Sequence, residues 1–170
     1  MAQAVKVVTN KVRFSYANVF QPKAQMEGGA LKYSISLIIP KSDKETIDRI
    51  NKAVEKVKAD NADMFKGVAA KLLKGGLRDG DEEKPNDPAY ANSYFINANS
   101  GQKPGVVDAD LQPIIDASEF YSGCYGRASV NFFPYNQSGS RGVGCGLNNV
   151  QKLEDGEKLG GGTVAAVDFA

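Results

Sequence analysis

The stretch from Tyr121 to Leu153 constrains the fold most, because it reads as one long β-hairpin. Residues 124–135, CYGRASVNFFPY, alternate between two kinds of side chain, and a second strand-like run begins at Arg141. The residues between the two runs, NQSGS, are typical of a turn. Glycines within strands permit bulges and corners, and these runs contain Gly123, Gly126, Gly142, Gly144 and Gly146. The pattern predicts a long hairpin in a strongly bent antiparallel sheet.

The alternation separates two faces of the first strand of this hairpin. One face is small and apolar, as the interior of a small barrel requires, and it consists of Cys124, Gly126, Ala128, Val130, Phe132 and Pro134. The other face is aromatic, cationic and hydrogen-bonding, and it consists of Tyr125, Arg127, Ser129, Asn131, Phe133 and Tyr135. The second face is unusual for a strand that only fills a core.

The rest of the chain predicts further strands and a helical insertion. Alternation indicates strands at 4–16 and 31–39, the second ended by Pro40. Ser42 and Glu45 match a capping box, and apolar residues at helical spacing follow to about Ala59. We expect a second helical stretch at 63–74, a polar loop at 78–93, and short strands at 94–98, 105–109 and 113–116.

This order of elements predicts a mainly β fold with a helical insertion at about 42–76. Two strands, an insertion, several short strands and a long hairpin suit a small antiparallel β-barrel or curled sheet with helices on one side. At 170 residues the chain is long enough for one domain with its own core. We expect that domain to cover 1–158, followed by a flexible tail at 159–170 that contains three consecutive glycines.

Several kinds of chemistry are disfavoured by the composition. The chain has no histidine and only two cysteines, so we expect no metal site, no cofactor and no catalytic residues. The acidic run from Asp79 to Glu83 is interpreted as a solvated loop. A metal-dependent nuclease would need scattered acids such as Asp108, Asp116 and Glu119 to converge. Cys124 and Cys145 could face each other across the hairpin, but without a secretory signal a reduced pair is favoured.

The aromatic and cationic face of the hairpin suits single-stranded nucleic acid. Such a groove needs flat rings on which bases stack and cations that follow the phosphates. The alternative is that the rings cover a second small core. The predicted DNA-binding residues are those of the first strand together with cations on neighbouring strands, namely Tyr125, Arg127, Asn131, Phe133, Tyr135, Arg141, Lys11, Arg13 and Lys32.

Four stretches resemble a family of bacteriophage single-stranded DNA-binding proteins. They are KYSISLIIPKSD (32–43), NANSGQKPGVVD (97–108), YSGCYGRASVNFFPY (121–135) and GLNNVQKLEDGEKLGGG (146–162). The resemblance spans nearly the whole chain. It implies an OB-fold barrel that coats single-stranded DNA during phage replication or recombination, without catalysis, in the cytoplasm of the infected host cell. It assigns no contact residues, so the site above rests on the two faces of the strand.

The end of the chain bears on partner proteins. Many replicative single-strand binders end in an acidic tail with a terminal aromatic residue that recruits replication or recombination proteins. Here Asp168 and Phe169 are similar, but Asp168 is the only acid of the last eleven residues, so a plain flexible end is equally consistent. The longest apolar runs are a few residues, as at 37–39, and we expect no membrane span. A phage structural or assembly protein is the alternative function.

Overall fold

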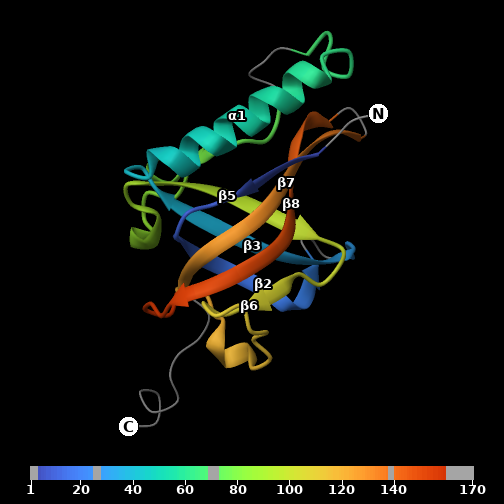
Figure 1. Cartoon of the computed structure of the whole chain (residues 1–170). Helices are drawn as coiled ribbons and strands as arrows, with labels where there is room; N and C mark the ends of the chain where they lie inside the picture. The colour runs from blue at the N-terminus through green and yellow to red at the C-terminus, as the bar shows by residue number, and fades with distance from the viewer. Residues whose placement is uncertain (1–3, 25–27, 69–72, 138–139, 160–170) are drawn as a thin grey trace.

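A computed structural model of the protein describes residues 4–24, 28–68, 73–137 and 140–159. Among these residues the fold is mostly β (Figure 1), and two segments are α-helices. The strands are β1 (Val5–Val8), β2 (Val12–Ala24), β3 (Leu31–Pro40), β4 (Arg78–Asp79), β5 (Ser93–Ser100), β6 (Gly105–Val107), β7 (Tyr125–Gln137) and β8 (Ser140–Glu154). The helices are α1 (Lys44–Asp60) and α2 (Gly80–Glu83), with short 3₁₀ turns η2 (Pro88–Tyr90) and η3 (Ala117–Glu119).

The strands form one strongly curled sheet. Its order is β1-β7-β2-β3-β5-β8-β6, and β7 also pairs with β8. The pairings of β7, β2, β3, β5 and β8 therefore return to the strand where they began. All of these pairings are antiparallel except that between β5 and β8, which are parallel neighbours with Asn99 opposite Gly146. The predicted long hairpin is confirmed as β7 and β8.

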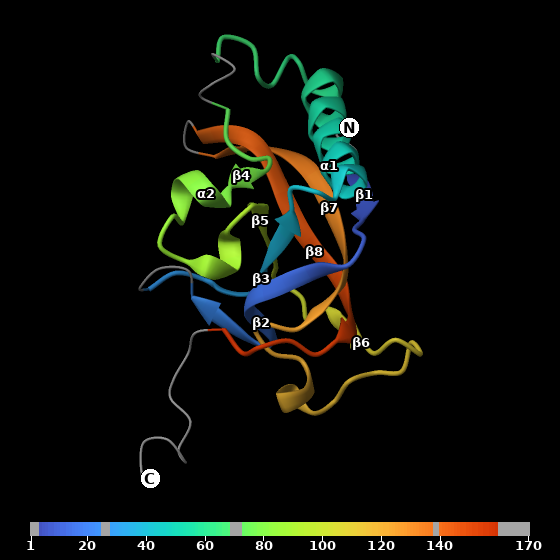
Figure 2. The ribbon, with the colours of Figure 1, turned by 90° about the vertical axis from the view of Figure 1, so that its left-hand side faces the viewer.

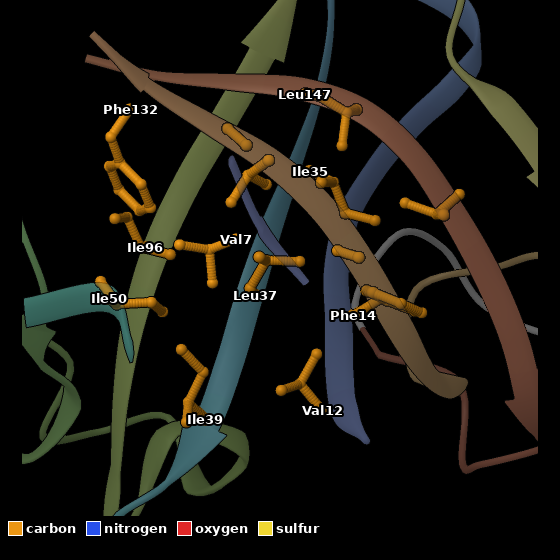
Figure 3. Close-up of a cluster of buried hydrophobic side chains, with 14 of the residues drawn as sticks. Val7, Val12, Phe14, Ile35, Leu37, Ile39, Ile50, Ile96, Phe132 and Leu147 are labelled. Carbon is orange, nitrogen blue, oxygen red and sulfur yellow. The ribbon is translucent and has the colours of Figure 1, made fainter. Parts of the chain in front are cut away.

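The core fills the inside of this curled sheet (Figure 3). Alternate residues of β3, namely Ile35, Leu37 and Ile39, are buried there, as the period of two predicts. Burying each such side chain contributes about 1.5–3 kcal/mol. Leu31, which shares this face by alternation, lies beyond the core at the start of β3 and is exposed.

Helix α1 covers one end of the core. Ile50, Ala53, Val54 and Val57 form its buried face, as their spacing predicts. The N-cap is Asp43, whose carboxylate accepts a hydrogen bond from the Thr46 N–H at 3.1 Å. The expected capping pair of Ser42 and Glu45 is therefore wrong by one residue. Within the described residues no helix is long and apolar enough to cross a membrane.

Some sequence predictions are wrong. The strand expected at 4–16 is two strands, because Thr9 donates its backbone N–H to Ala128 while its hydroxyl accepts from the same residue, which ends β1. Strand β2 continues to Ala24. The second helix expected at 63–74 is a series of turns over the described residues 61–68, and 69–72 lie outside the description.

The loops also differ from expectation. At 113–116 the chain forms only an isolated bridge, between Pro113 and Val107, rather than a strand. The polar loop expected at 78–93 contains β4, α2 and η2 and packs on the outside of β3 and β5 (Figure 2). The cysteines are free and do not face each other, because Cys145 lies opposite Phe132 and Cys124 precedes β7.

Candidate nucleic-acid interface

The two faces predicted for β7 are present in the structure. Ala128, Val130 and Phe132 are buried in the core. The residues between them point to the outside of the sheet, because successive side chains of a strand alternate. That outer face carries the predicted residues Tyr125, Arg127, Asn131, Phe133 and Tyr135. These residues do not form one continuous surface, because different groups surround them at the start, in the middle and at the far end of β7.

Tyr125, at the start of β7, is half-buried and held by contacts within the chain. The Lys11 ammonium lies 5.9 Å from the centre of its ring, and the Arg13 guanidinium lies 5.4 Å from it. Gly156 lies so close to the ring that a Cβ there would come within 2.7 Å of it. The ring is therefore enclosed by cations and backbone.

The two cations beside Tyr125 have further partners within the chain. Lys11 forms an ion pair with Glu154 at 2.8 Å, and the hydrogen bond in that pair raises the pKa of Lys11. Arg13 donates to the backbone carbonyls of Gly123 at 3.1 Å and Glu157 at 2.8 Å. The bond from Arg13 to Glu157 therefore connects β2 with the segment after β8, and Lys11 connects the residues before β2 with the end of β8.

The middle of the β7 face is polar. The Arg127 Nε donates to the backbone carbonyl of Thr9 at 2.9 Å, and its side chain faces the space between β1 and α1. The side-chain Nδ2 of Asn131 donates to the side-chain Oδ1 of Asn148 at 3.0 Å, and the Nδ2 of Asn148 donates to the Ser129 hydroxyl at 3.3 Å. This amide network presents hydrogen-bonding groups on the outside of β7 and β8.

An exposed aromatic ring lies toward the far end of β7. Phe133 is 38% exposed, and its ring lies over Gly144, where a Cβ would come within 2.5 Å of the ring. Tyr135 follows opposite Gly142. Arg141 is near this end and donates to the backbone carbonyl of Lys66 at 3.2 Å. Lys32 lies apart from all of these residues, on β3 opposite Lys23.

A groove crosses the outer face of β2, β3 and β5. It has a volume of about 250 Å³ and is lined by Tyr16, Asn18, Lys23, Ala24, Ser34, Ile35, Ser36, Lys84, Tyr90, Asn97, Ala98 and Asn99. Most of these side chains carry amide, hydroxyl or ammonium groups. Lys84 and Tyr90 of this lining belong to the segment containing α2 and η2 that packs against the sheet. Figure 2 shows α2 on the left of the sheet.

Tyr16 is turned into this groove by an irregularity in β2. Strict alternation after Val12 and Phe14 would direct its ring into the core. Instead, the register of β2 against β3 shifts between Ser15 and Asn18, and Tyr16 has a φ of 47° and a 60% exposed side chain. A bulky residue in the left-handed region is rare and strained, and such positions cluster at functional sites. A bulge commonly redirects a side chain.

Lys84 reaches Tyr16 from the segment that packs on the outside of the sheet. Its ammonium lies 5.4 Å from the centre of the Tyr16 ring and 5.2 Å from that of the Tyr90 ring. Tyr90 is fully buried, and its hydroxyl donates to the Ser36 hydroxyl at 3.2 Å. The buried ring of Tyr90 therefore holds the charge of Lys84 at the groove.

The acidic run of this segment holds it in place. Asp79 caps α2 by accepting the Asp81 N–H. Lys41 forms ion pairs with Asp79 at 3.0 Å and Asp81 at 2.9 Å. Asp81 also accepts the Asn92 N–H at 3.0 Å. Hydrogen bonds from Lys41 and Asn92 lower the pKa of Asp81.

A row of polar residues connects the groove with the face of β7. Cross-strand register places Asn18 opposite Ser34, Ser34 opposite Asn99, Asn99 opposite Gly146, and Gly146 opposite Asn131. Asn18 donates to the Ser34 hydroxyl at 3.2 Å. The row therefore spans five strands, from Tyr16 in the groove to Phe133 beyond Asn131.

An exposed ring with cations and amides beside it can stack a base and bind phosphates without a defined sequence. Tyr16, Lys23, Lys84, Asn97 and Asn99 were not predicted from the sequence. Lys32, Ser34 and Ser36 alternate with apolar residues in the sequence of β3, but nothing in the sequence marks the bulge at Tyr16. Among the described residues no three Cys, Asp or Glu side chains gather as a metal site.

Comparison with known proteins gives consistent matches over most of the chain. A family model described as "Enterobacter phage Enc34, ssDNA-binding protein" matches residues 5–170. A relative from Acyrthosiphon pisum secondary endosymbiont phage 1, named putative protein p50, is 32% identical over 171 residues and covers 96% of this chain and 91% of its own.

Solved structures of phage proteins have the same fold. The single-stranded DNA-binding protein of bacteriophage Enc34 in complex with ssDNA matches with a TM-score of 0.81 and 25% identity, over 91% of this chain and 89% of that one. The single-stranded DNA-binding protein gp2.5 of bacteriophage T7 matches with a TM-score of 0.61 and 16% identity, over 99% and 96% of the two chains. The T7 match concerns the fold alone.

Proposed function

The chain belongs to the family of the Enterobacter phage Enc34 ssDNA-binding protein, and on that premise we propose that it binds single-stranded DNA. Binding is non-catalytic and largely independent of sequence, and it serves phage DNA replication or recombination in the cytoplasm of the infected host cell. Family membership favours this function over that of a structural protein of the phage particle.

The groove at Tyr16 is the observation that carries this proposal. It combines an exposed ring, the ammonium groups of Lys23 and Lys84, and the amides of Asn97 and Asn99. Each base offers a flat face to an aromatic side chain whatever its identity, and stacking is worth about 1–3 kcal/mol per base. DNA that follows the polar row would pass from this groove to Asn131, Phe133 and Tyr135.

The residues predicted from the sequence enter the proposal in different ways. Asn131, Phe133, Tyr135 and Arg141 form a second contact region on β7 and β8. Lys32, opposite Lys23, adds a third positive charge to those of Lys23 and Lys84 at the groove. Lys11, Arg13 and Tyr125 form the part of this surface next to the start of β7, and their contacts within the chain hold them in place. Arg127 lies to the side of this path.

We also propose an OB-fold barrel as the architecture. The circuit of pairings through β7, β2, β3, β5 and β8 supports it, as does the parallel neighbour relation of β5 and β8. OB-folds bind oligonucleotides on the face of their second and third strands, and here β3 and β5 line the groove. One domain would cover residues 1–158. The tail at 159–170, with Asp168 and Phe169, is a candidate contact for partner proteins; from residue 160 it lies outside the described residues.

Substitution of Tyr16 tests the proposed function. Tyr16→Ala should weaken binding of oligo-dT by about 5- to 150-fold at fixed salt, the equivalent of 1–3 kcal/mol of stacking. Fluorescence anisotropy with a labelled oligonucleotide measures the affinity. Tyr16→Phe, which keeps the ring, should bind nearly as tightly as the original protein.

A glycine at the same position separates binding from folding. Tyr16→Gly removes the ring but fits the left-handed backbone without strain. It should lose affinity as alanine does and keep its melting temperature. Normal affinity of both the alanine and the glycine variants would exclude this groove. Degradation of the oligonucleotide in magnesium, absent in EDTA, would contradict the non-catalytic part of the proposal.

A further inference from the structure

We propose that neighbouring copies of this protein contact each other head to tail on one DNA strand. The segment 108–119 of one copy inserts into the groove between β1 and α1 of the next copy. Only the alignment of copies on DNA rests on the proposed function. The contact itself rests on two surfaces at opposite ends of the molecule.

The segment 108–119 presents exposed apolar side chains among acids. Ile115 is 88% exposed and Leu111 is 69% exposed. The segment contains four acids, Asp108, Asp110, Asp116 and Glu119, and no Lys or Arg. Exposed apolar side chains that lie together and are rimmed by polar groups can mark a surface that contacts another protein.

This segment is held in one conformation. The Asp108 carboxylate accepts the backbone N–H groups of Asp110 at 2.9 Å and Gln112 at 3.0 Å. Ile114 is buried in the core, and its N–H donates to Val106 at 2.8 Å. Leu111 and Ile115, on either side of this anchored chain, are therefore displayed with little conformational freedom to lose on binding.

The groove between β1 and α1 has the complementary properties. Its volume is about 570 Å³, and its lining consists of Val5, Lys6, Val7, Val8, Arg49, Lys52, Ala53, Lys56 and Arg127. Five of these residues are cationic, and the others are apolar. The lining contains no acid. It therefore offers an apolar floor for aliphatic side chains and cations for carboxylates.

Carboxylates on the neighbouring turns of α1 already pair with three of these cations. Glu45 pairs with Arg49, Asp48 with Lys52, and Asp60 with Lys56. These pairs are exposed and separated by four residues, so each contributes only about 0.3–0.5 kcal/mol. They can be exchanged for an incoming carboxylate. No ion pair between described residues involves Lys6 or Arg127.

The edge of β1 offers backbone groups to the same groove. Thr9 donates its N–H to Ala128 on β7, so alternation along β1 directs the backbone groups of Lys6 and Val8 away from β7. Arg49 donates to the Val8 carbonyl at 3.0 Å from this side. An extended chain, such as the part of the segment between Gln112 and Asp116, can lie along this edge.

The two surfaces lie at opposite ends of the molecule. In both ribbon views α1 is at the top, and the segment between β6 and β7, which contains residues 108–119, is at the bottom (Figures 1 and 2). A contact between two different surfaces of identical copies does not close on itself and produces an open chain. An open chain of copies can follow a single strand of DNA, along which the binding sites also repeat in a line.

This contact is expected to be weak without DNA. A segment of this length buries less than the roughly 800 Å² per partner that a stable complex needs. Copies on one DNA strand are held at an effective concentration in the millimolar range, on the order of that given by a short linker. The contact should therefore appear as cooperative binding to long DNA.

The test compares one short oligo-dT, which holds a single copy, with a long oligo-dT. The original protein should bind the long DNA at least about tenfold more tightly per site. Two variants should bind both lengths with nearly equal affinity per site: Lys52→Glu with Lys56→Glu in the groove, and Asp110→Lys with Glu119→Lys in the segment. All should retain their affinity for the short oligo-dT.

Two further proteins complete this comparison. The variant that combines all four substitutions exchanges the charges of the two surfaces, and it should regain the preference for long DNA. Lys44→Glu with Lys66→Glu matches the charge change of the groove variant at positions outside both surfaces. This control should keep the preference for long DNA, which separates a local contact from the effect of net charge.

Cross-linking tests the same contact without relying on affinity. Lys56→Cys and Ile115→Cys, mixed under oxidising conditions at high concentration, should form a mixed disulfide, and neither should form a dimer with itself at these positions. Long oligo-dT should accelerate the reaction.

Three results would overturn the proposal. The first is equal affinity of the original protein per site on short and long DNA. The second is loss of short-oligonucleotide binding in the groove variant, which would assign the groove to DNA phosphates. The third is absence of the mixed disulfide. If the protein binds no DNA at all, the proposed function fails, and the cross-link at high concentration still decides the contact.

Discussion

Single residues in this protein owe their exposure or burial to local backbone features. Tyr16 is exposed because β2 bulges after Ser15. Phe133 is exposed on the alternate face of β7, over a glycine that leaves room for its ring. Cys145 is on the neighbouring strand β8, and burial raises the pKa of its thiol to about 12.

Both cysteines should react slowly in the folded protein. Burial raises the pKa of Cys124 as well as that of Cys145. Thiolate is the reactive form, so at pH 8 very little is present at either position. An aromatic disulfide reagent should modify neither thiol quickly in buffer and both at once in guanidinium chloride. Cys145→Ser should reduce the number of thiols modified in denaturant from two to one. Two fast equivalents in buffer would contradict the burial of Cys124 and the partial burial of Cys145.

At the scale of elements, β7 and β8 approach each other and their neighbours closely at several glycines. A Cβ at Gly126 would lie 1.8 Å from the backbone oxygen of Gln151 on β8. The three atoms nearest to a Cβ at Gly144 all belong to the outer part of the Phe133 ring, the first at 2.5 Å. The backbone cannot move without breaking the pairing of the strands, whereas an exposed ring can turn.

Alanine at these two glycines should therefore have different effects. Gly126→Ala should destabilise the fold by about 1–3 kcal/mol or more, as overpacking against backbone does. Gly144→Ala should cost much less stability and should instead displace Phe133. Urea denaturation measures both changes. Similar losses in the two variants would show that the contacts at Gly126 relax as easily as those of a side chain.

The stability of the segment from β4 to η2 should depend on pH. Hydrogen bonds from Lys41 lower the pKa of Asp81, and those from Arg78 lower the pKa of Glu83. Carboxylates with a depressed pKa stabilise the fold above their unfolded values of about 4, and this contribution is lost as pH falls through the folded values. The pKa of Lys41 is raised, so its contribution is fully present below about pH 10 and is lost as pH rises through the raised pKa of the folded state.

This segment should therefore be most ordered between about pH 5 and pH 10. The NMR signal of the Asn92 amide, which donates to Asp81, should report its loosening in acid. Asp81→Asn should weaken the segment at neutral pH and reduce its response to acid. Glu82→Gln, a change at the neighbouring carboxylate, should leave the response in place. An Asn92 signal unchanged down to pH 2 would contradict the role of these ion pairs.

The regular elements could be predicted from the sequence, and the irregular ones could not. The period of two in β3 and the 3.6-residue period in α1 are visible because Ile35, Leu37, Ile50 and Val54 face one core. The break after β1 depends on hydrogen bonds between Thr9 and Ala128, a residue more than a hundred positions away. The groove was missed for the same reason, because Tyr16 and Lys84 meet only through a bulge and a packed loop.

At the scale of the whole molecule, cations near the groove are few. Lys23 and Lys84 line it and Lys32 lies beside it, while Lys11 and Arg13 already have partners in the chain. Each phosphate contact on single strands contributes a slope of about −0.7 to the dependence of log affinity on log salt.

The salt dependence of binding should thus be moderate. Three contacts predict a slope of about −2, and a further contact by Arg141 beside the β7 face would extend it to about −2.8. Lys84→Gln should flatten the slope by about 0.7, and Lys44→Gln, on α1 outside the groove, should leave it unchanged. Affinity for oligo-dT that does not vary with salt would exclude phosphate contacts by these residues.

The parallel pairing of β5 and β8 has a mechanical consequence. Among the described residues these strands share one register pair, Asn99 with Gly146, whereas β7 and β8 are joined along most of their length. We therefore expect the circuit of strands to open more easily between β5 and β8 than between β7 and β8. Because Asn99 lies in the groove, such an opening would widen the groove while the rest of the sheet keeps its shape. A purine and a pyrimidine, which differ in size, can then be held by the same surface.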